Sequence, residues 1–521
     1  RPSSSTSSRR KSERGIAKTL DPPPSRALMS PAASTAIPTI NSRSLRRTPA
    51  RAARAAHLDA ASQHCHEDEA ATEVEDIIAG TNCKGKMPLN AGAEIQNKAQ
   101  SSYLSLSRPL SSHTLPKVKQ IFGDVSWKGA RGKSFEGEKK ISTVALITDE
   151  DMLLHESADT HNENPARLIS IMSNLRKGKL INRCDLFKPD EIGVKYMLDV
   201  HSSTHVKDIV SIATKNQDQR DNLALKHCSK GDMYYSQGST RAALLAAGGS
   251  VKACTLAVEG MYKYAFALVR PPGHHAGLRG PSGFCLLNNV AVGAMHLLNK
   301  YQMKKIVILD WDIHHGNGTQ KIFYKDNRVL VISVHRYGGG FYPDSSEGNT
   351  EHIGEGVGRG FNANICFTHN GIRDVDYITV WEHLVMPVIS EFDPEIVLIS
   401  AGFDAAEGDD LGQCKVTPNG FATLLQMLMK FDRLVMVLEG GYNLDALSES
   451  VSACIEVLLG EKSCIPLDRT ILPYSTTWEA IIETRKVLKP FWDACKQDIP
   501  ERIRSKSIPY AAQETTDEDI A

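Results

Sequence analysis

The chain has 521 residues, of which 41% are hydrophobic and 23% are charged, and its 61 basic residues balance its 61 acidic residues. A chain without net charge has no overall field that would draw it to nucleic acid or an anionic membrane. No apolar run approaches the roughly 20 residues that a bilayer-spanning helix needs, and the eleven cysteines include no CxxC pair, which argues against a disulfide framework and a cysteine-type zinc module. We therefore expect a soluble protein of a reducing compartment, with no membrane partner and no direct reading of nucleic acid by its folded domain.

Residues 1–140 are predicted to form a disordered basic arm and linker. Residues 1–57 hold twelve Arg or Lys against only Glu13 and Asp21, and they are rich in Ser, Pro and Ala, so they cannot bury enough apolar surface to fold. This stretch fits a solvated tail, a nuclear-import patch or an organelle transit peptide. The expected location is therefore the nucleus and/or the cytoplasm, with an organelle as the alternative.

A short cluster inside this arm, His64, Cys65 and His66, offers metal-binding side chains. A structural zinc site needs a fourth ligand, which the neighbouring sequence does not supply. An incidental cluster is therefore the favoured interpretation.

Residues 141–460 alternate short β-branched apolar runs with longer helical patterns. The runs are apolar on both faces, which is typical of parallel strands covered by helices. The predicted strands are 143–149, 264–270, 305–312, 329–335, 361–367, 395–404 and 434–441, and the clearest helical patterns are 164–178, 239–260, 289–302 and 417–431. This alternation predicts one doubly wound α/β domain.

Residues 461–521 are predicted to form a C-terminal extension. An amphipathic helix is expected within 476–497, packed on the domain or on a partner, and the acidic end of the chain is expected to be disordered.

Four of the predicted strands run into reactive segments, "RPPGHHAG", "DWDIHHGNG", "AGFDAAEGDDLG" and "EGGYN". Each residue alone has a simpler explanation, such as a capping Asp or a packed His. Ligands of open α/β sheets, however, bind beyond the carboxyl ends of the strands. The convergence of these residues therefore predicts an active site, formed by His274, His275, Asp310, Asp312, His314, Asp404 and Tyr442.

Strand alternation separates the members of "DWDIHHGNG". With a side-chain period of two, Asp310, Asp312 and His314 share one face, while His315 lies on the other and is expected to have a packing role. With Asp404 from another strand end, Asp312 and His314 give a divalent cation three ligands and leave a position open for water and substrate. This is the plan of a catalytic zinc site, and ferrous iron also suits these ligands.

Amide hydrolysis at such a metal needs further groups. A base must take the proton of water, an acid must protonate the leaving amine, and a donor must stabilise the oxyanion. The pair His274 and His275 can transfer the protons and Tyr442 can donate. Gly273, Gly440 and Gly441 would allow the backbone to approach the site closely.

Together "RPPGHHA", "GFCLLNNVA", "DWDIHHGNGTQ", "VHRYGGGFYP", "SAGFDAAEGD" and "LEGGYN" resemble the zinc-dependent histone deacetylases, in particular class II, over roughly residues 145–460. The resemblance implies the three-layer arginase/deacetylase α/β fold with a central parallel, roughly eight-stranded sheet. It also implies hydrolysis of N6-acetyl-lysine in histones or other proteins to lysine and acetate. Implied partners are an acetylated protein substrate and a corepressor complex.

Carried over by position, the resemblance assigns the zinc ligands to Asp312, His314 and Asp404. It assigns the general base and acid to His275, with His274 as an electrostatic partner oriented by Asp310. Asn317 stands where class I members have Asp and becomes the partner of His275. Tyr442 is the oxyanion donor, which argues against the class IIa subgroup, where His replaces it.

The resemblance also assigns a substrate channel and a structural potassium ion. Phe284 and Tyr342 would wall the lysine stem, although Tyr342 replaces the usual Phe and adds a hydroxyl. The remaining substrate-binding assignments are Gly283 through its carbonyl, Leu411 at the rim, Gly440, and Arg167 near an acetate-release path. The potassium would be held by oxygens of Asp310, Asp312, His314, Ser333 and Val334.

Two other functions are kept open. An acetylpolyamine amidohydrolase would share the fold and catalytic set but take a small cationic substrate, which acidic residues at the rim would favour. A non-catalytic acetyl-lysine-binding corepressor scaffold is disfavoured by the complete ligand set and by Tyr442.

Overall fold

An eight-stranded, all-parallel sheet forms the centre of the fold in a computed structural model that describes residues 121–123, 127–128, 144–228, 232–461, 468 and 470–511. Its strands are β1 (Val144–Ile147), β2 (Asp185–Phe187), β3 (Tyr264–Ala267), β4 (Ile306–Asp310), β5 (Val329–Arg336), β6 (Asn362–Phe367), β7 (Ile396–Ala401) and β8 (Leu434–Leu438). The strand order is β2-β1-β3-β8-β7-β4-β5-β6. Strands β3, β8, β7 and β4 are therefore neighbours, and these are the four whose carboxyl ends carry the predicted reactive residues.

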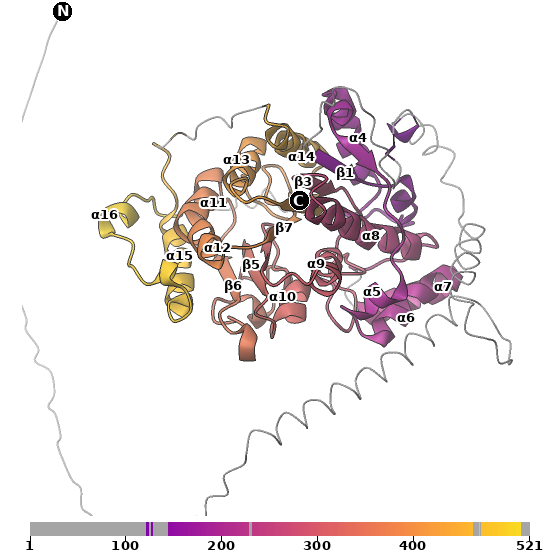
Figure 1. Cartoon of the computed structure of the whole chain (residues 1–521), viewed down its shortest axis with the longest axis horizontal. Helices are drawn as coiled ribbons and strands as arrows, with labels where there is room; N and C mark the ends of the chain where they lie inside the picture. Colours follow the sequence, from indigo (N-terminus) through magenta and orange to yellow (C-terminus); the bar gives the residue numbers. More distant parts are fainter. Residues whose placement is uncertain are drawn as a thin grey trace, which may run out of the picture. The chain divides into compact units, whose positions relative to one another are not determined.

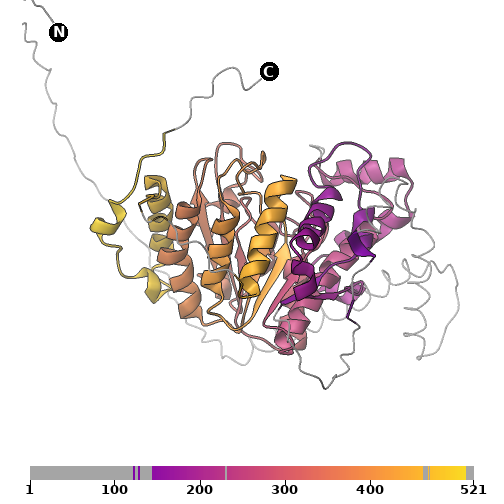
Figure 2. The same ribbon diagram turned by 90° about the horizontal axis from the view of Figure 1, so that it is seen from above.

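The helices cover both faces of the sheet. They are α4 (Ala166–Lys177), α5 (Val194–Leu198), α6 (Ser203–Ser211), α7 (Gln217–His227), α8 (Ser239–Val258), α9 (Asn289–Lys300), α10 (Asn317–Phe323), α11 (Asp374–Val380), α12 (Met386–Phe392), α13 (Pro418–Leu428), α14 (Leu444–Leu458), α15 (Ser475–Leu488) and α16 (Glu501–Arg504). Helices α4, α14, α13 and α11 pack side by side on one face, whereas α8, α9 and α10 lie on the other (Figure 1). The view from above shows the first layer in front of the strands (Figure 2). This is the predicted three-layer arrangement.

The strand residues explain why the sheet is covered on both sides. Every residue of β4, "IVILD", and of β7, "IVLISA", is buried, as expected for parallel strands between two helical layers. The sequence did not predict β2, because its three residues are too few to show a period. It is an edge strand beside β1, and its first residue, Asp185, is partly exposed.

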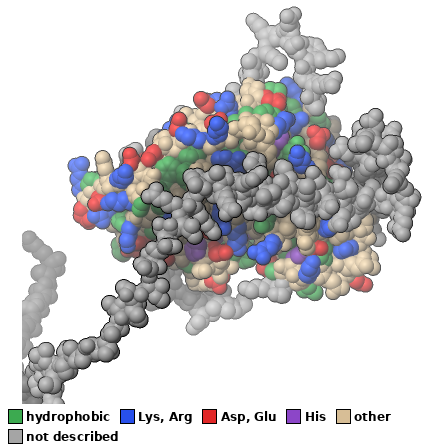
Figure 3. All heavy atoms as spheres, turned by 60° about the horizontal axis from the view of Figure 1, so that its bottom comes forward, with side chains coloured by type: hydrophobic (Ala, Val, Ile, Leu, Met, Phe, Trp, Pro, Cys, Tyr) green, Lys and Arg blue, Asp and Glu red, His purple; other side chains and the backbone are tan. Residues whose placement is uncertain are grey.

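Helix α8 corrects the expectation that no apolar run reaches membrane-spanning length. Within the described ranges it alone is long and apolar enough to cross a membrane, but 72% of its apolar window is buried in the fold. It packs between β3 and α9, so its apolar character is that of a core helix. On the face shown in Figure 3, basic and acidic side chains are interspersed where described residues are visible.

The packed part of the chain reaches into the predicted arm. Ile121 and Phe122 are 9% and 4% exposed, and Trp127 forms an isolated bridge with Leu186. Apart from residues 121–123 and 127–128, residues 1–140 lie outside the described residues, and so do His64, Cys65, His66 and the acidic end after residue 511.

The predicted C-terminal helix, α15, packs along the edge strand β6. After it, the Trp492 ring packs edge to face against Phe361 and Phe392, with ring centroids 5.5 and 6.0 Å away, and its indole N–H donates to the Gly360 carbonyl at 2.8 Å. The extension therefore covers an edge that would otherwise offer unpaired backbone groups to another strand.

Replacing this anchor is expected to loosen the extension. Trp492→Ala should lower the free energy of unfolding by about 3 kcal/mol, because it removes a large buried ring and its hydrogen bond. Urea denaturation followed by circular dichroism measures the change. Val357→Ala, at a side chain 69% exposed, is the control and should change stability by less than about 0.5 kcal/mol; equal losses in both variants would contradict the anchoring role.

Candidate active site and metal centre

The predicted reactive residues meet at the carboxyl edge of the sheet. A pocket of about 280 Å³ is lined there by Asp232, which lies between α7 and α8, and by residues that follow several strands, namely His275, Gly283, Phe284, His314, Gly340, Phe341, Tyr342, Leu411 and Tyr442. The parallel sheet delivers these side chains to one edge because all its strands point the same way.

Asp312, His314 and Asp404 form a group of metal-ligand type at this edge, with one donor atom of each within 4.8 Å of the others. His314 Nδ1 lies 3.2 Å from Asp312 Oδ1 and 2.9 Å from Asp404 Oδ2. Both carboxylates are fully buried. The Gly440 backbone is equally close, since a Cβ at that position would lie 2.3 Å from Asp404 Oδ2 and 2.6 Å from Asp312 Oδ2.

The electrostatics of this group fit a divalent cation. Although burial favours a neutral ring, the carboxylate of Asp404 raises the pKa of His314 to about 9. Burial, together with the neighbouring Asp312, raises the pKa of Asp404 to about 7. The group therefore favours a positive charge at the point where the three side chains meet. A metal ion that displaces the ring proton supplies this charge, and two carboxylates with one imidazole are ligands that suit zinc or ferrous iron.

The local geometry after β4 differs from the predicted one. The strand ends at Asp310 rather than 312, so strand pleating does not orient the next side chains. Instead Asp310 Oδ1 accepts from the Asp312 N–H at 3.1 Å, and Asp312 Oδ1 accepts from the His314 N–H at 2.9 Å. Two successive Asx turns thus hold Asp312 and His314. His315 points away, as predicted, and its Nε2 contacts Gln320 Oε1 at 2.9 Å.

The two histidines of "PGHHAG" have different partners. His274 Nδ1 lies 2.8 Å from the Asp310 carboxylate, and His275 Nδ1 lies 2.8 Å from Asn317 Oδ1. An amide oxygen only accepts, so His275 carries its proton on Nδ1 and leaves Nε2 as a free base.

These partners separate the protonation states of the pair. Burial opposes a charge on His274, but the carboxylates of Asp310 and Asp312 raise its pKa well above the ordinary value. Burial and the neighbouring His274 and His314 hold the pKa of His275 well below it. One member of the pair is therefore held charged and the other neutral, which is how acid and base roles are divided in active sites.

Tyr442 follows β8 on a segment whose backbone groups are held by hydrogen bonds to side chains. Its backbone N–H donates to Asp409 Oδ2 at 2.6 Å. Arg167, which is fully buried, donates to the carbonyls of Glu439 at 2.5 Å and Gly441 at 2.7 Å, and its guanidinium lies 5.0 Å from the Tyr442 ring centre. Arg167 therefore stands behind Tyr442, where it supports the backbone of this segment.

The predicted channel residues also lie together. Gly283, Phe284, Tyr342 and Leu411 line the same pocket as His275. The Tyr342 hydroxyl lies 2.7 Å from Ser282 Oγ, so its polar atom already has a partner in the wall. Gly440 lies beneath the two metal-ligand carboxylates rather than on the wall.

The sequence prediction missed several residues of the site. Asp232, Gly340 and Phe341 line the pocket, and the Phe341 ring stacks on His314 at 4.8 Å. Glu439 and Asp409 stand inside motifs that were singled out, and an acidic residue beside a glycine turn was the signal that could have found them.

Of the residues proposed for potassium, Asp312 and His314 belong to the metal-ligand group, and Asp310, Ser333 and Val334 lie on strands β4 and β5. Asp310 pairs in register with Ser333 of β5, and Val334 follows it in that strand. Asp310, Asp312 and His314 belong to the turn described above. The potassium assignment stays a prediction.

Comparison with known proteins agrees with this geometry. A family model for the histone deacetylase domain matches residues 161–458. This chain belongs to the histone deacetylase domain family. Histone deacetylase 5 of Arabidopsis thaliana is 42% identical over 374 residues, covering 70% of this chain and 56% of that protein. The crystal structure of the HDA15 HD domain superposes with a TM-score of 0.61 at 40% identity, covering 68% of this chain and 97% of that one.

A more distant relative bears a different name. Polyamine deacetylase HDAC10 of Mus musculus is 35% identical over 371 residues, covering 70% of this chain and 55% of that protein. The chain thus spans little more than half the length of these two relatives. The family-model match, residues 161–458, lies within the predicted domain of residues 141–460.

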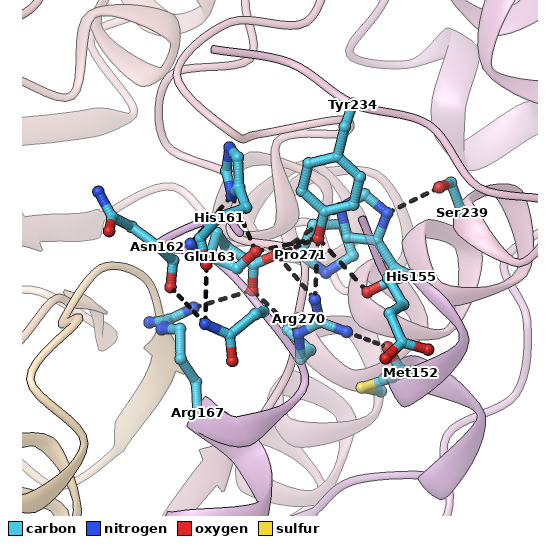
Figure 4. A network of polar contacts seen from close by, with 12 residues as sticks. Met152, His155, His161, Asn162, Glu163, Arg167, Tyr234, Ser239, Arg270 and Pro271 are labelled. Atoms are coloured by element: carbon cyan, nitrogen blue, oxygen red, sulfur yellow. Dashed lines mark hydrogen bonds and ion pairs between the residues drawn. The ribbon is translucent and has the colours of Figure 1, made fainter. Parts of the chain in front are cut away.

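The deacetylase domain supports its site with a buried ion cluster (Figure 4). Glu163 accepts from Arg270 through both oxygens, at 2.9 and 2.8 Å, and from Arg167 at 3.2 Å. The Tyr234 hydroxyl donates to the same carboxylate at 3.1 Å. Burial and the neighbouring Arg270 lower the pKa of His155 to about 3, so this ring adds no charge. One carboxylate therefore compensates two buried guanidinium groups, one of which supports Tyr442.

Neutralising this carboxylate is expected to destabilise the domain. Glu163→Gln should lower the free energy of unfolding at pH 7 by about 3 to 5 kcal/mol, because it leaves two buried guanidinium groups without an anion. Arg270 holds the pKa of Glu163 below its ordinary value in spite of burial. The carboxylate's contribution is thus fully present above the unfolded pKa of about 4.5 and is lost as pH falls toward the folded pKa.

Urea unfolding of wild type and variant at pH 7 and near pH 3 measures both effects. The difference between the two proteins should shrink at the lower pH. A difference independent of pH would contradict the ionic origin of the stabilisation.

Proposed function

We propose that this chain is a metal-dependent lysine deacetylase, which hydrolyses the N6-acetyl-lysine side chains of histones or other proteins to lysine and acetate. The observation that carries the proposal is the group of Asp312, His314 and Asp404, with His275 and Tyr442 facing the same pocket. Membership of the histone deacetylase domain family supports it. The proposed metal is zinc, with ferrous iron as an alternative.

Asp312, His314 and Asp404 would hold the zinc. Bound there, the ion would supply Lewis-acid polarisation of the substrate carbonyl and a lowered pKa for water. His275, whose Nδ1 proton is directed to Asn317, accepts a proton from the attacking water at Nε2 and returns it to the leaving lysine amine. His274 remains paired with Asp310 and keeps a positive charge beside the reacting groups.

The Tyr442 hydroxyl donates to the oxyanion that forms as water adds to the amide carbon. The C–N bond then breaks, and the lysine amine leaves with the proton from His275. The Phe284 ring and the Tyr442 ring meet edge to face at 5.6 Å, so the wall that contacts the lysine stem also steadies the donor.

Acidic side chains at the mouth of the site are compatible with the polyamine alternative. A second pocket of about 380 Å³ adjoins the first, shares Leu411 and Tyr442 with it, and includes Asp410 and Asp445. Carboxylates at the mouth attract cationic substrates. Both a polyamine and a basic histone tail meet this condition, so the two substrates must be compared directly.

A scaffold without catalysis is the less favoured function, because the site retains the ligand group, the histidine pair and Tyr442. A corepressor complex and a location in the nucleus and/or cytoplasm are part of the proposal, with an organelle as the alternative. Imaging of the tagged full-length protein tests the location.

Substrate choice is tested by measuring kcat/KM for an acetyl-lysine peptide and for acetylspermidine with the zinc-loaded chain. We expect the peptide to be preferred. A strong preference for acetylspermidine would reassign the substrate, and absence of turnover with both would favour the scaffold.

Removing the oxyanion donor tests the chemistry. Tyr442→Phe should lower kcat for the peptide roughly 100-fold to 1,000-fold, as for other oxyanion donors, while zinc content by atomic emission stays unchanged. The control Tyr474→Phe loses the phenol hydroxyl of a residue in the C-terminal extension whose ring packs against Arg373, and it should keep wild-type kcat. Unchanged turnover in Tyr442→Phe would refute the donor role, and full activity after chelation of the metal would refute the metal site.

A further inference from the structure

Glu439 is a fully buried carboxylate to which neither the proposed mechanism nor the resemblance assigns a role. It follows β8 directly, and its Oε2 accepts from the backbone N–H of Gly273 at 2.6 Å and of His274 at 3.0 Å. These two donors belong to the loop after β3, which carries the histidine pair. Glu439 thus connects two of the strand ends that form the site.

The position of these bonds explains why a side chain is needed. Backbone pairing between β3 and β8 ends at Ala267 and Val437. Beyond this point the Glu439 N–H donates to Ala401 of β7 on the other side, at 3.1 Å. The carboxylate therefore continues the link from β8 to β3 where the ladder has stopped.

The environment of the second carboxylate oxygen of Glu439 indicates that this side chain serves to bind the Gly273 and His274 backbone. Oε1 is buried and has no hydrogen-bond partner within the described part of the chain. A buried acceptor without a partner is costly, and in native structures such a group calls for an explanation. The two bonds of Oε2 to the histidine loop supply one.

The backbone around Glu439 is tied to the other functional parts. Arg167 donates to its carbonyl, and the next residue, Gly440, donates its N–H to Asp312 Oδ2 at 2.9 Å. Tyr442 follows two residues later. One short segment therefore holds the histidine loop through a side chain, a metal-ligand carboxylate through a backbone N–H, and the oxyanion donor through the chain itself.

We infer that Glu439 is a positioning residue for deacetylation, which sets the place of the His274–His275 backbone relative to Asp312 and Tyr442. The inference rests on the proposed function for its kinetic consequence, whereas its geometric part stands independently. It acts through hydrogen-bond acceptance, so a neutral residue with an oxygen in the same place should replace it.

Two variants of the full chain separate position from charge. Glu439→Ala removes the acceptor and should lower kcat for an acetyl-lysine peptide roughly 10-fold to 100-fold, the range for residues that orient an active site from behind. Its KM should stay within about threefold, because the channel walls are untouched, and zinc content should be unchanged. Glu439→Gln keeps an acceptor oxygen and should recover kcat to within about fivefold of wild type.

Glu395 is a control with the same hydrogen-bond pattern at the amino ends of the strands, although its side chain is exposed whereas that of Glu439 is buried. Glu395 Oε2 also accepts from two consecutive backbone N–H groups, of Lys304 at 2.6 Å and Lys305 at 3.0 Å, before β4 begins. Glu395→Ala removes the same hydrogen-bond pattern away from the site and should leave kcat at the wild-type value. An equal loss of kcat in Glu395→Ala would show a general effect of destabilisation and overturn the inference.

Hydrogen–deuterium exchange of the Gly273 and His274 amides gives a readout that needs no turnover. Exchange there should be at least roughly tenfold faster in Glu439→Ala than in wild type and close to wild type in Glu439→Gln, since an amide that loses its partner loses protection. If wild type fails to hydrolyse the peptide, the proposed function fails, and exchange alone decides the geometric part. If Glu439→Ala does not fold, Glu439→Gln decides.

Wild-type kcat in a folded Glu439→Ala would overturn the inference, as would unchanged exchange at both amides. A hundredfold loss of kcat in Glu439→Gln would also overturn it, because charge rather than position would then be the contribution of this residue.

Discussion

Four buried carboxylates at one edge of a parallel sheet are the constraint on which the rest of this structure depends. Asp310, Asp312, Asp404 and Glu439 are at most 1% exposed. Burying four acids so close together in space is unfavourable unless hydrogen bonds and positive charge compensate them. The strand-end glycines, the Asx turns and the imidazole rings all contribute to this compensation, and a divalent cation at the proposed metal site would complete it. The hydrogen bonds and positive charge that stabilise these buried carboxylates are therefore the same features that the proposed chemistry needs.

The compensation continues away from the pocket. Arg167 bonds the segment that carries Tyr442 on one side and the Glu163 carboxylate on the other. That carboxylate in turn binds Arg270, which ends the run from β3 into the histidine loop. The histidine loop and the tyrosine segment are thus joined twice, once through Glu439 and once through this ion cluster. Two independent links between the same strand ends restrict the motion of the catalytic groups relative to one another.

Sequence patterns predicted most of the fold because parallel strands buried on both faces are continuous apolar runs. The three-residue β2 escaped because no pattern fits so short a segment. Alternation paired Asp312 with His314 correctly, yet for a reason that fails beyond Asp310, where Asx turns rather than pleating orient them. The contact of Tyr342 with Ser282 and the role of Glu439 require knowledge of which loops meet, and local sequence does not contain it.

The geometry of the site is in the end a property of sheet register. Asp310 pairs with Ser333 on one side and with Ser400 on the other, and its two carboxylate oxygens then contact the Asp312 N–H and His274. Because side chains alternate with a period of two, a slip of one residue in β4 would turn Asp310 to the opposite face and break both contacts together. The strand pairing that holds the core is thus also the pairing that aligns the proposed metal ligands with the histidines. The reactive residues follow strands that are buried on both faces, and burial of this kind specifies the strand register strongly.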